Sequence, residues 1–157
     1  MKKLLGFSIF LVFVLIASLT AEAKVTLPAI FSDNMVLQQN TQVNVWGKAA
    51  PGEKVTVKAS WLDKAVTAKA AANGKWTVKL KTPKATTNQS VTVSGENEIT
   101  INNVLIGEVW LCTGQSNMEF PVSRHPDVKW NTGMLNEAEE LKDADYPEIR
   151  LFHVKHQ

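Results

Sequence analysis

Polar and apolar residues alternate through residues 24–103 in short runs. The runs lie at 43–46, 54–58, 76–80, 90–93 and 98–101. A period of two puts one set of side chains on a buried face and the other in solvent, as in an antiparallel sheet. Turn-forming residues separate the runs, and the pair Asn73-Gly74 favours a hairpin because both residues tolerate positive φ. Short strands at this spacing predict a β-sandwich domain over residues 24–103.

From residue 104 the alternation gives way to continuous apolar runs. Residues 104–106 and 109–112 have no polar alternation, which is typical of strands buried on both faces of a parallel sheet. Residues 134–142 predict a helix with one apolar face, and residues 149–154 predict the next strand. Strand, turn, helix and strand form the opening βαβ unit of an α/β domain. We therefore expect residues 104–157 to begin such a domain without completing it.

The first 23 residues have the pattern of a signal peptide. Lys2 and Lys3 are followed by an apolar run at 4–19, and small residues flank Glu22 where a signal peptidase would cleave. Residues Met1–Ala23 are therefore expected to direct the chain to the periplasm or the cell exterior and to be removed, leaving no membrane anchor. The alternative, an uncleaved anchor, is less favoured because the run is short for a membrane span.

Composition narrows the class of protein. The apolar fraction of 45% and the formal charge of +2 are those of a folded domain rather than a disordered chain. No cluster of Lys and Arg follows the N-terminus, so we expect no nucleic-acid partner. Cys112 is the single cysteine and therefore cannot form an internal disulfide.

Ser116 is the candidate nucleophile. It follows the predicted strand at 109–112 directly, in a turn made tight by Gly114. Open α/β sheets bind ligands beyond the carboxyl ends of their strands. A helix beginning near Asn117 would add free backbone N–H groups for an oxyanion. Spacing alone favours an ordinary turn, and the α/β-hydrolase elbow is absent because Met118 replaces its second glycine.

Several segments resemble one known family. Residues 107–120 read GEVWLCTGQSNMEF, and residues 30–38 read IFSDNMVLQ. Further matching segments are VWG at 45–47, APGEKV at 50–55 and YPEIRLF at 146–152. In this order they resemble the N-terminal portion of the sialate O-acetylesterases, a branch of the SGNH hydrolases. Gln39 and Lys48 depart from the family pattern, where Arg and Trp are expected.

The resemblance implies a carbohydrate esterase that hydrolyses O-acetyl esters on sugars through an acetyl-enzyme. By it Ser116 is the nucleophile and its backbone N–H an oxyanion donor, while Gly114, Gln115 and Asn117 shape the turn. No metal or organic cofactor is implied, and the partner is an acetylated carbohydrate. The resemblance leaves open which sugar is cleaved and what oligomer forms.

The catalytic set of the family is incomplete in this chain. No Asp is followed three residues later by His, so the Asp-x-x-His segment that supplies the general base is missing. Later Gly and Asn oxyanion donors of the family are missing as well. We therefore expect the chain to be inactive alone. His125, His153 and His156 are more readily explained as surface residues than as substitute bases.

A second hypothesis is a secreted β-sandwich carbohydrate-binding module with a vestigial hydrolase tail. It requires exposed aromatic side chains on one sheet face, and Trp46, Trp61 and Trp76 are the candidates. Large aromatics more often fill a core, and that is our expectation for these three. Cys112 is likewise expected to be a buried strand residue, with a thiol made inert by apolar surroundings.

Overall fold

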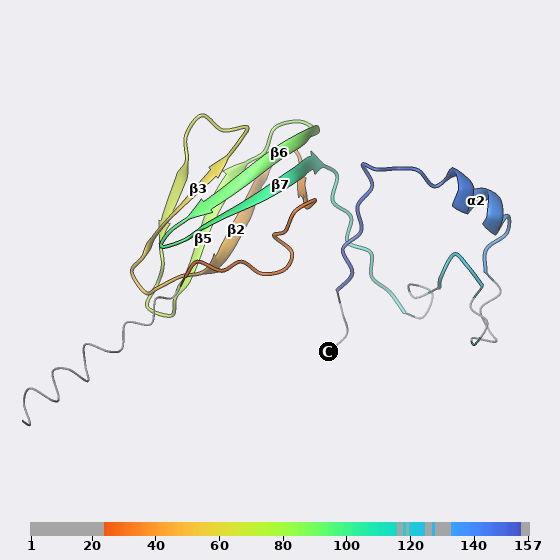
Figure 1. Ribbon diagram of the computed structural model, residues 1–157, viewed down its shortest axis with the longest axis horizontal. Helices are drawn as coiled ribbons and strands as arrows, with labels where there is room; N and C mark the ends of the chain where they lie inside the picture. Colours follow the sequence, from red (N-terminus) through yellow and green to blue (C-terminus); the bar gives the residue numbers. More distant parts are fainter. Residues whose placement is uncertain (1–23, 116–117, 119, 125–126, 128–132, 155–157) are drawn as a thin grey trace, which may run out of the picture.

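The computed structural model describes residues 24–115, 118, 120–124, 127 and 133–154. The predicted signal peptide lies outside these residues. The strands are β1 (Val36–Gln38), β2 (Gln42–Lys48), β3 (Lys54–Ala59), β4 (Val66–Lys69), β5 (Lys75–Lys81), β6 (Thr86–Ser94) and β7 (Glu98–Gly107), and the helix is α2 (Glu137–Asp143) (Figure 1). All five alternating runs fall within strands, so this part of the sequence prediction is confirmed.

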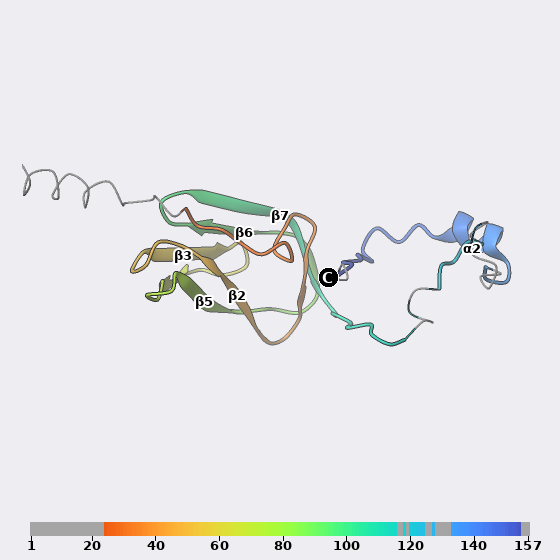
Figure 2. The same ribbon diagram turned by 90° about the horizontal axis from the view of Figure 1, so that it is seen from below.

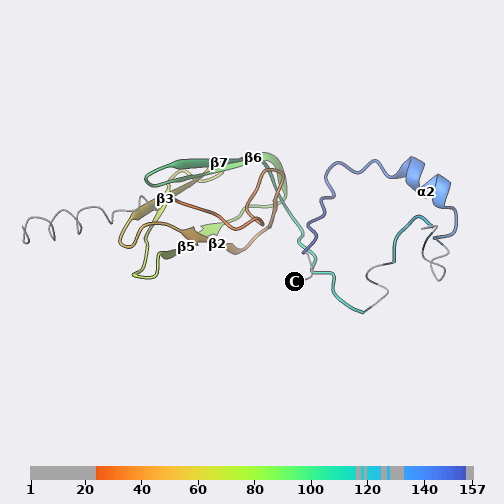
Figure 3. The ribbon, with the colours of Figure 1, turned by 60° about the horizontal axis from the view of Figure 1, so that its bottom comes forward.

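The strands form two sheets. The larger has the order β1-β7-β6-β3-β4, and the smaller pairs β2 with β5. Only the pairing of β1 with β7 is parallel among the strands described, so the larger sheet is mixed. Figures 2 and 3 show β6 and β7 in one layer and β2 and β5 in a second layer facing it.

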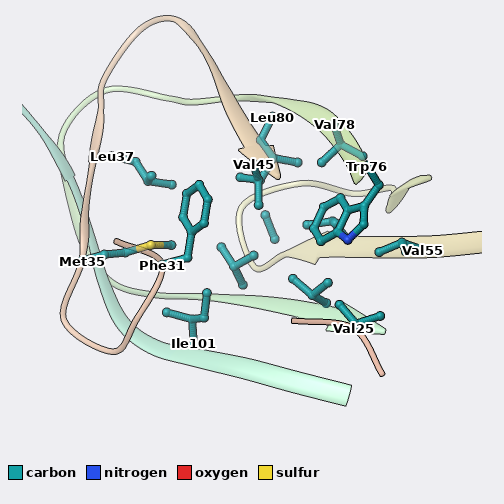
Figure 4. Close-up of a cluster of buried hydrophobic side chains, with 14 of the residues drawn as sticks. Val25, Phe31, Met35, Leu37, Val45, Val55, Trp76, Val78, Leu80 and Ile101 are labelled. Atoms are coloured by element: carbon teal, nitrogen blue, oxygen red, sulfur yellow. The ribbon is translucent and has the colours of Figure 1, made fainter. Parts of the chain in front are cut away.

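The alternation along each strand fills the space between the two layers. In β5 the side chains of Trp76, Val78 and Leu80 are buried, while the lysines between them are exposed. The facing sheet contributes buried residues such as Val57 and Val93. Figure 4 shows Trp76, Val78 and Leu80 pointing into one core, to which Val25, Phe31 and Met35 from the N-terminal part of the chain also belong.

Trp76 packs against the backbone of its neighbour across the small sheet. It pairs with Gly47 of β2, and a Cβ at position 47 would lie 2.9 Å from the indole atom Cζ2. Glycine is therefore required there, because a Cβ would overlap the Thr26 carbonyl oxygen and would also crowd the ring. The indole Nε1 is buried and has no hydrogen-bond partner among the described residues, so the ring is held by packing.

The predicted hairpin at Asn73-Gly74 is wrong, although the turn is present. Gly74 has a φ of 74°, and its N–H donates to the Ala71 carbonyl over 2.9 Å. The strands on either side belong to different sheets, since β4 pairs with β3 and β5 with β2. Turn chemistry fixes the reversal of the chain, whereas the packing of the core selects the partner of each strand.

Residues 104–106 do not open a second sheet. They lie in β7, which continues across the expected boundary between residues 103 and 104 and ends at Gly107. The run is buried because β7 has a neighbour on each side and a bulge interrupts its alternation. Asn103, with a φ of 52°, occupies the irregular position. The continuous apolar run at 104–106 is therefore explained by a bulge in a central strand of the larger sheet, not by a strand of a second, parallel sheet.

The strands expected at 109–112 and 149–154 are absent from the structure. Leu111 and Leu151 are 89% and 95% exposed, and neither segment pairs with a described strand. The predicted helix is confirmed in position but is shorter, and α2 buries no residue. Apolar segments form strands when neighbouring strands and a covering layer bury them, and the described residues supply neither. The described fold is therefore a mixed β structure with few helical residues.

Candidate functional site

The predicted nucleophile segment around the Gly114–Met118 turn follows β7 after a stretch of irregular chain. Gly114 and Gln115 are exposed, and the Met118 N–H donates to the Gln115 carbonyl over 2.9 Å. A Cβ at Gly114 would lie 2.8 Å from Cγ of Met118, so a larger residue at position 114 would displace the Met118 side chain. Ser116 and Asn117 lie outside the described residues, and their roles stay predictions.

The start of this segment is tied to the end of β1 by a hydrogen-bond network around Glu108. One carboxylate oxygen accepts from the Gln38 amide over 3.0 Å, and the other accepts from the Gln39 amide over 2.7 Å. The Val109 N–H donates to the side-chain oxygen of Gln38 over 2.8 Å. These two amide donors lower the pKa of Glu108 below its ordinary value of 4.5, because they stabilise the charged form.

Known proteins similar to this chain share one activity in their names. A sialate O-acetylesterase from Mus musculus is 30% identical over 138 residues, which cover 80% of this chain. The chain belongs to the sialate O-acetylesterase family. The enzymes of the same name from Rattus norvegicus and Homo sapiens are 31% and 29% identical. No family profile matches the chain.

A solved structure supports the same family. A carbohydrate acetylesterase from Xanthomonas citri is 37% identical, with a TM-score of 0.59 over 63% of this chain. This match covers 22% of that enzyme, and the sialate O-acetylesterase matches cover 24% of each relative. The chain therefore spans about a quarter of the length of the relatives that it resembles.

The histidines and the cysteine of this family member do not form a catalytic cluster in the described part of the chain. His153 is exposed, while His125 and His156 lie outside the described residues. Cys112 is exposed and free, so the expectation that it is buried in a strand is wrong. The reason is that no described strand pairs with residues 109–112. Within the described ranges no group of three or more His, Cys, Asp or Glu is arranged to bind a metal, and no helix is long and apolar enough to span a membrane.

The three tryptophans do not share one surface. Trp76 is 3% exposed and belongs to the core, as expected. Trp61 packs against the core edge, and its Nε1 donates to the Lys81 carbonyl over 2.9 Å. Trp46 is 43% exposed and meets Phe31 edge to face, with 4.6 Å between ring centroids. The core expectation therefore holds for Trp76, in part for Trp61, and not for Trp46.

The polar residues that form the Glu108 network are present in the sequence, but their sequence positions do not indicate that they meet. Gln38 is the last residue of β1 and Gln39 follows it, and Glu108 follows β7 about 70 residues later. Their meeting depends on the parallel register that pairs Gln38 with Gly107. An alternation pattern contains no information on which distant strands pair in parallel, so the network was missed.

The lowered pKa of Glu108 predicts a pH-dependent attachment of Val109. A carboxyl whose pKa is lowered by folding stabilises the folded contacts above its ordinary pKa, and this contribution is lost as the pH falls through the lowered value. As the pH is lowered from about 7, the titration of the Val109 amide resonance is therefore expected to have its midpoint below pH 4.5. NMR titration measures this, and Glu108→Gln is the control that removes the transition. A transition of Val109 centred above pH 4.5 would contradict the assignment.

Proposed function

We propose that this chain is the N-terminal portion of a carbohydrate esterase that removes O-acetyl groups from sugars, with Ser116 as nucleophile. The observation that carries the proposal is the shared family of its relatives, named sialate O-acetylesterases in mammals and a carbohydrate acetylesterase in Xanthomonas citri. The segments that resemble the family include residues 107–120, which contain Ser116. This segment resembles the nucleophile segment of the SGNH hydrolases. The substrate is an acetylated carbohydrate.

The reaction follows from the chemistry of a serine nucleophile. The Ser116 hydroxyl attacks the carbonyl carbon of the acetyl ester while a general base takes its proton. The backbone N–H of Ser116 donates to the oxyanion of the tetrahedral intermediate. The bond to the sugar oxygen then breaks, and that oxygen takes the proton from the base. Water hydrolyses the acetyl-enzyme, which releases acetate and restores the hydroxyl.

The chain alone lacks the group that would take the proton. The Asp-x-x-His segment implied by the family resemblance does not occur in its sequence. His153, the one described histidine, is exposed on a segment without regular structure. We propose that the base and the further oxyanion donors belong to the part of the relatives that this chain does not match.

The two sheets are proposed to form a β-sandwich domain that is separate from the hydrolase domain. The shared core between the layers supports this division, and so does the exposed, irregular chain after β7. On this basis the hydrolase portion begins near Glu108 and includes the Gly114–Met118 turn. The proposal needs no metal, organic cofactor or nucleic acid.

A sugar-binding module is the weaker alternative. It would need a row of exposed aromatic rings, and burial of Trp76 removes one of the three candidates. Of these three, Trp46 alone presents a substantial exposed face. Titration of the chain with acetylated oligosaccharides, followed by tryptophan fluorescence, distinguishes the two functions. Saturable binding by the chain alone would favour the module.

The first test of the esterase proposal uses the chain as it stands. Purified residues 24–157 are expected to hydrolyse p-nitrophenyl acetate no faster than their Ser116→Ala variant, because a serine hydroxyl without a positioned base is a weak nucleophile. The measurement is the absorbance of the p-nitrophenol released. A rate that depends on Ser116 would mean that the chain contains a base of its own.

Export is proposed from the signal-like N-terminus. A cleaved signal peptide leaves Lys24 as the first residue of the mature protein. N-terminal sequencing of protein recovered from a secreting host measures this, with protein made in the presence of a signal-peptidase inhibitor as control. Membrane-bound protein that keeps Met1 without the inhibitor would indicate the uncleaved anchor instead.

A further inference from the structure

Both ends of the segment that contains the Gly114–Met118 turn are attached to the same sheet. Glu108 binds at the end of β1 where the chain leaves β7, and Arg150 binds β7 where the chain returns. A cavity of about 1190 Å³ lies between the sheet and the two attached ends, and Asn103, Glu108, Trp110 and Arg150 are among its lining residues. The chain between Glu108 and Arg150 is therefore attached to the larger sheet at both of its ends.

The first attachment uses both the nitrogen and the oxygen of two glutamine side-chain amides. Gln38 and Gln39 each donate to Glu108. The same two side chains accept from backbone N–H groups, Gln38 from Val109 and Gln39 from Ala85, each over 2.8 Å. The carboxylate thus orients two amides, which join the end of β1 to the chain at Val109 and at Ala85. Bonds to a charged acceptor are stronger than neutral ones, so Glu108 is the centre of this network.

The second attachment depends on the bulge in β7. The Asn102 N–H donates to Asp33 over 2.6 Å, and the Asn103 side chain donates to the Asn34 side chain over 2.7 Å. A bulge residue is left out of the ladder, so its polar groups are available to other partners. The Arg150 guanidinium donates to the Asn103 carbonyl. The bulge therefore presents an acceptor to the returning chain.

We propose that Glu108 and Arg150 are positioning residues that hold the two ends of the nucleophile segment on the larger sheet. The role in catalysis rests on the proposed esterase function, but the attachment itself does not. The larger sheet then acts as the base that orients the chain segment between Glu108 and Arg150, which contains Ser116. Neither residue is assigned contact with substrate.

The first attachment can be tested by exchanging the charge between partners. Glu108→Gln places an amide donor opposite the amide of Gln38 and breaks that bond. Adding Gln38→Glu supplies a carboxylate that accepts from the new amide and still accepts from the Val109 N–H, while the amide oxygen introduced at position 108 still accepts from Gln39. The double variant should therefore recover what the single variant loses, which a general loss of stability would not.

Cys112 provides the reporter because it is the single cysteine and is exposed. A nitroxide attached there in residues 24–157 is expected to become more mobile in Glu108→Gln and to return to the original spectrum in Gln38→Glu/Glu108→Gln. Exchange of the Val109 amide should rise about tenfold in the single variant, the scale of one lost hydrogen bond. Unchanged circular dichroism confirms folding in each variant. A nitroxide spectrum that is unchanged by Glu108→Gln, or not restored by the double variant, overturns the proposal for Glu108.

The second attachment needs a label beside Arg150. Leu151 is 95% exposed, so a nitroxide on Leu151→Cys in a Cys112→Ser background disturbs little packing. Arg150→Ala is expected to increase its mobility, whereas Arg124→Ala, the other arginine of this region, is expected to leave it unchanged. Equal spectra for Arg150→Ala and the parent overturn the proposal for Arg150. These readings require no substrate, so failure of the attachment and failure of the esterase proposal are separate results.

Discussion

Ser116→Ala is expected to abolish ester hydrolysis in a protein that spans the full length of the relatives. Attack on the acetyl carbonyl requires the hydroxyl, and no described side chain of the Gly114–Met118 turn is a comparable nucleophile. Loss of the nucleophile in another serine hydrolase lowers kcat by a factor on the order of 10⁶. We expect kcat to fall to the background rate, measured as acetate release from an acetylated sugar.

The expected loss is chemical rather than structural. Gln115, next to Ser116, is exposed, and exposed substitutions usually change stability by less than about 0.5 kcal/mol. The melting temperature of Ser116→Ala should therefore match that of the parent. Ser123→Ala is a matched control, since Ser123 is an exposed serine of the same region. Retained turnover in Ser116→Ala, or equal losses in both variants, would remove Ser116 from the nucleophile role.

Trp76→Ala is expected to produce the largest loss of stability. The indole is buried at 3% exposure and lies between the sheets against Gly47. Replacing a buried Trp by Ala costs about 3–5 kcal/mol, because the transferred area is lost and a cavity remains. The whole free energy of unfolding of a small domain is about 5–15 kcal/mol. Urea unfolding followed by circular dichroism measures the change.

Trp46→Ala is the matched control for the core prediction. Trp46 lies on β2, the strand paired with β5, but is 43% exposed and meets Phe31 only edge to face. Its replacement should cost about 1 kcal/mol, the scale of an aromatic pair. Equal losses for the two variants would contradict the placement of the core. They would also revive a functional interpretation of Trp76.

The variants at Trp76 and Ser116 act on different parts of the molecule. Trp76 packs in the core of the sheets to which Glu108 and Arg150 bind, while Ser116 lies between these two residues in the sequence. Loss of the core should therefore also release the loop from its base, and the nitroxide at Cys112 would report it. Loss of the Ser116 hydroxyl should leave both attachments intact.

Local sequence was sufficient to set the strands and their buried faces. Alternation at period two places Trp76, Val78 and Leu80 on one face of β5 wherever that strand is packed, because successive side chains point to opposite sides. The same kind of local pattern located the helix near residue 137 and the turn at Gly74. The family resemblance, which rests on several short segments including the one at 107–120, could likewise be read from the chain alone.

Which strands meet, and which apolar runs are buried, depends on contacts that form only in the folded chain. The run at 104–106 is buried because β1 and β6 flank β7, whereas the similar run at 109–112 is exposed because no described strand or layer covers it. The bonds of Glu108 to Gln38 and of Arg150 to Asn103 join residues 70 and 47 positions apart. Such contacts depend on the pairing of β1 with β7 and on a bulge, and a periodic pattern specifies neither. The burial of an apolar run and the hydrogen bonds of Glu108 and Arg150 depend on residues that are distant in sequence and close only in the folded chain. For this reason the local sequence does not determine them.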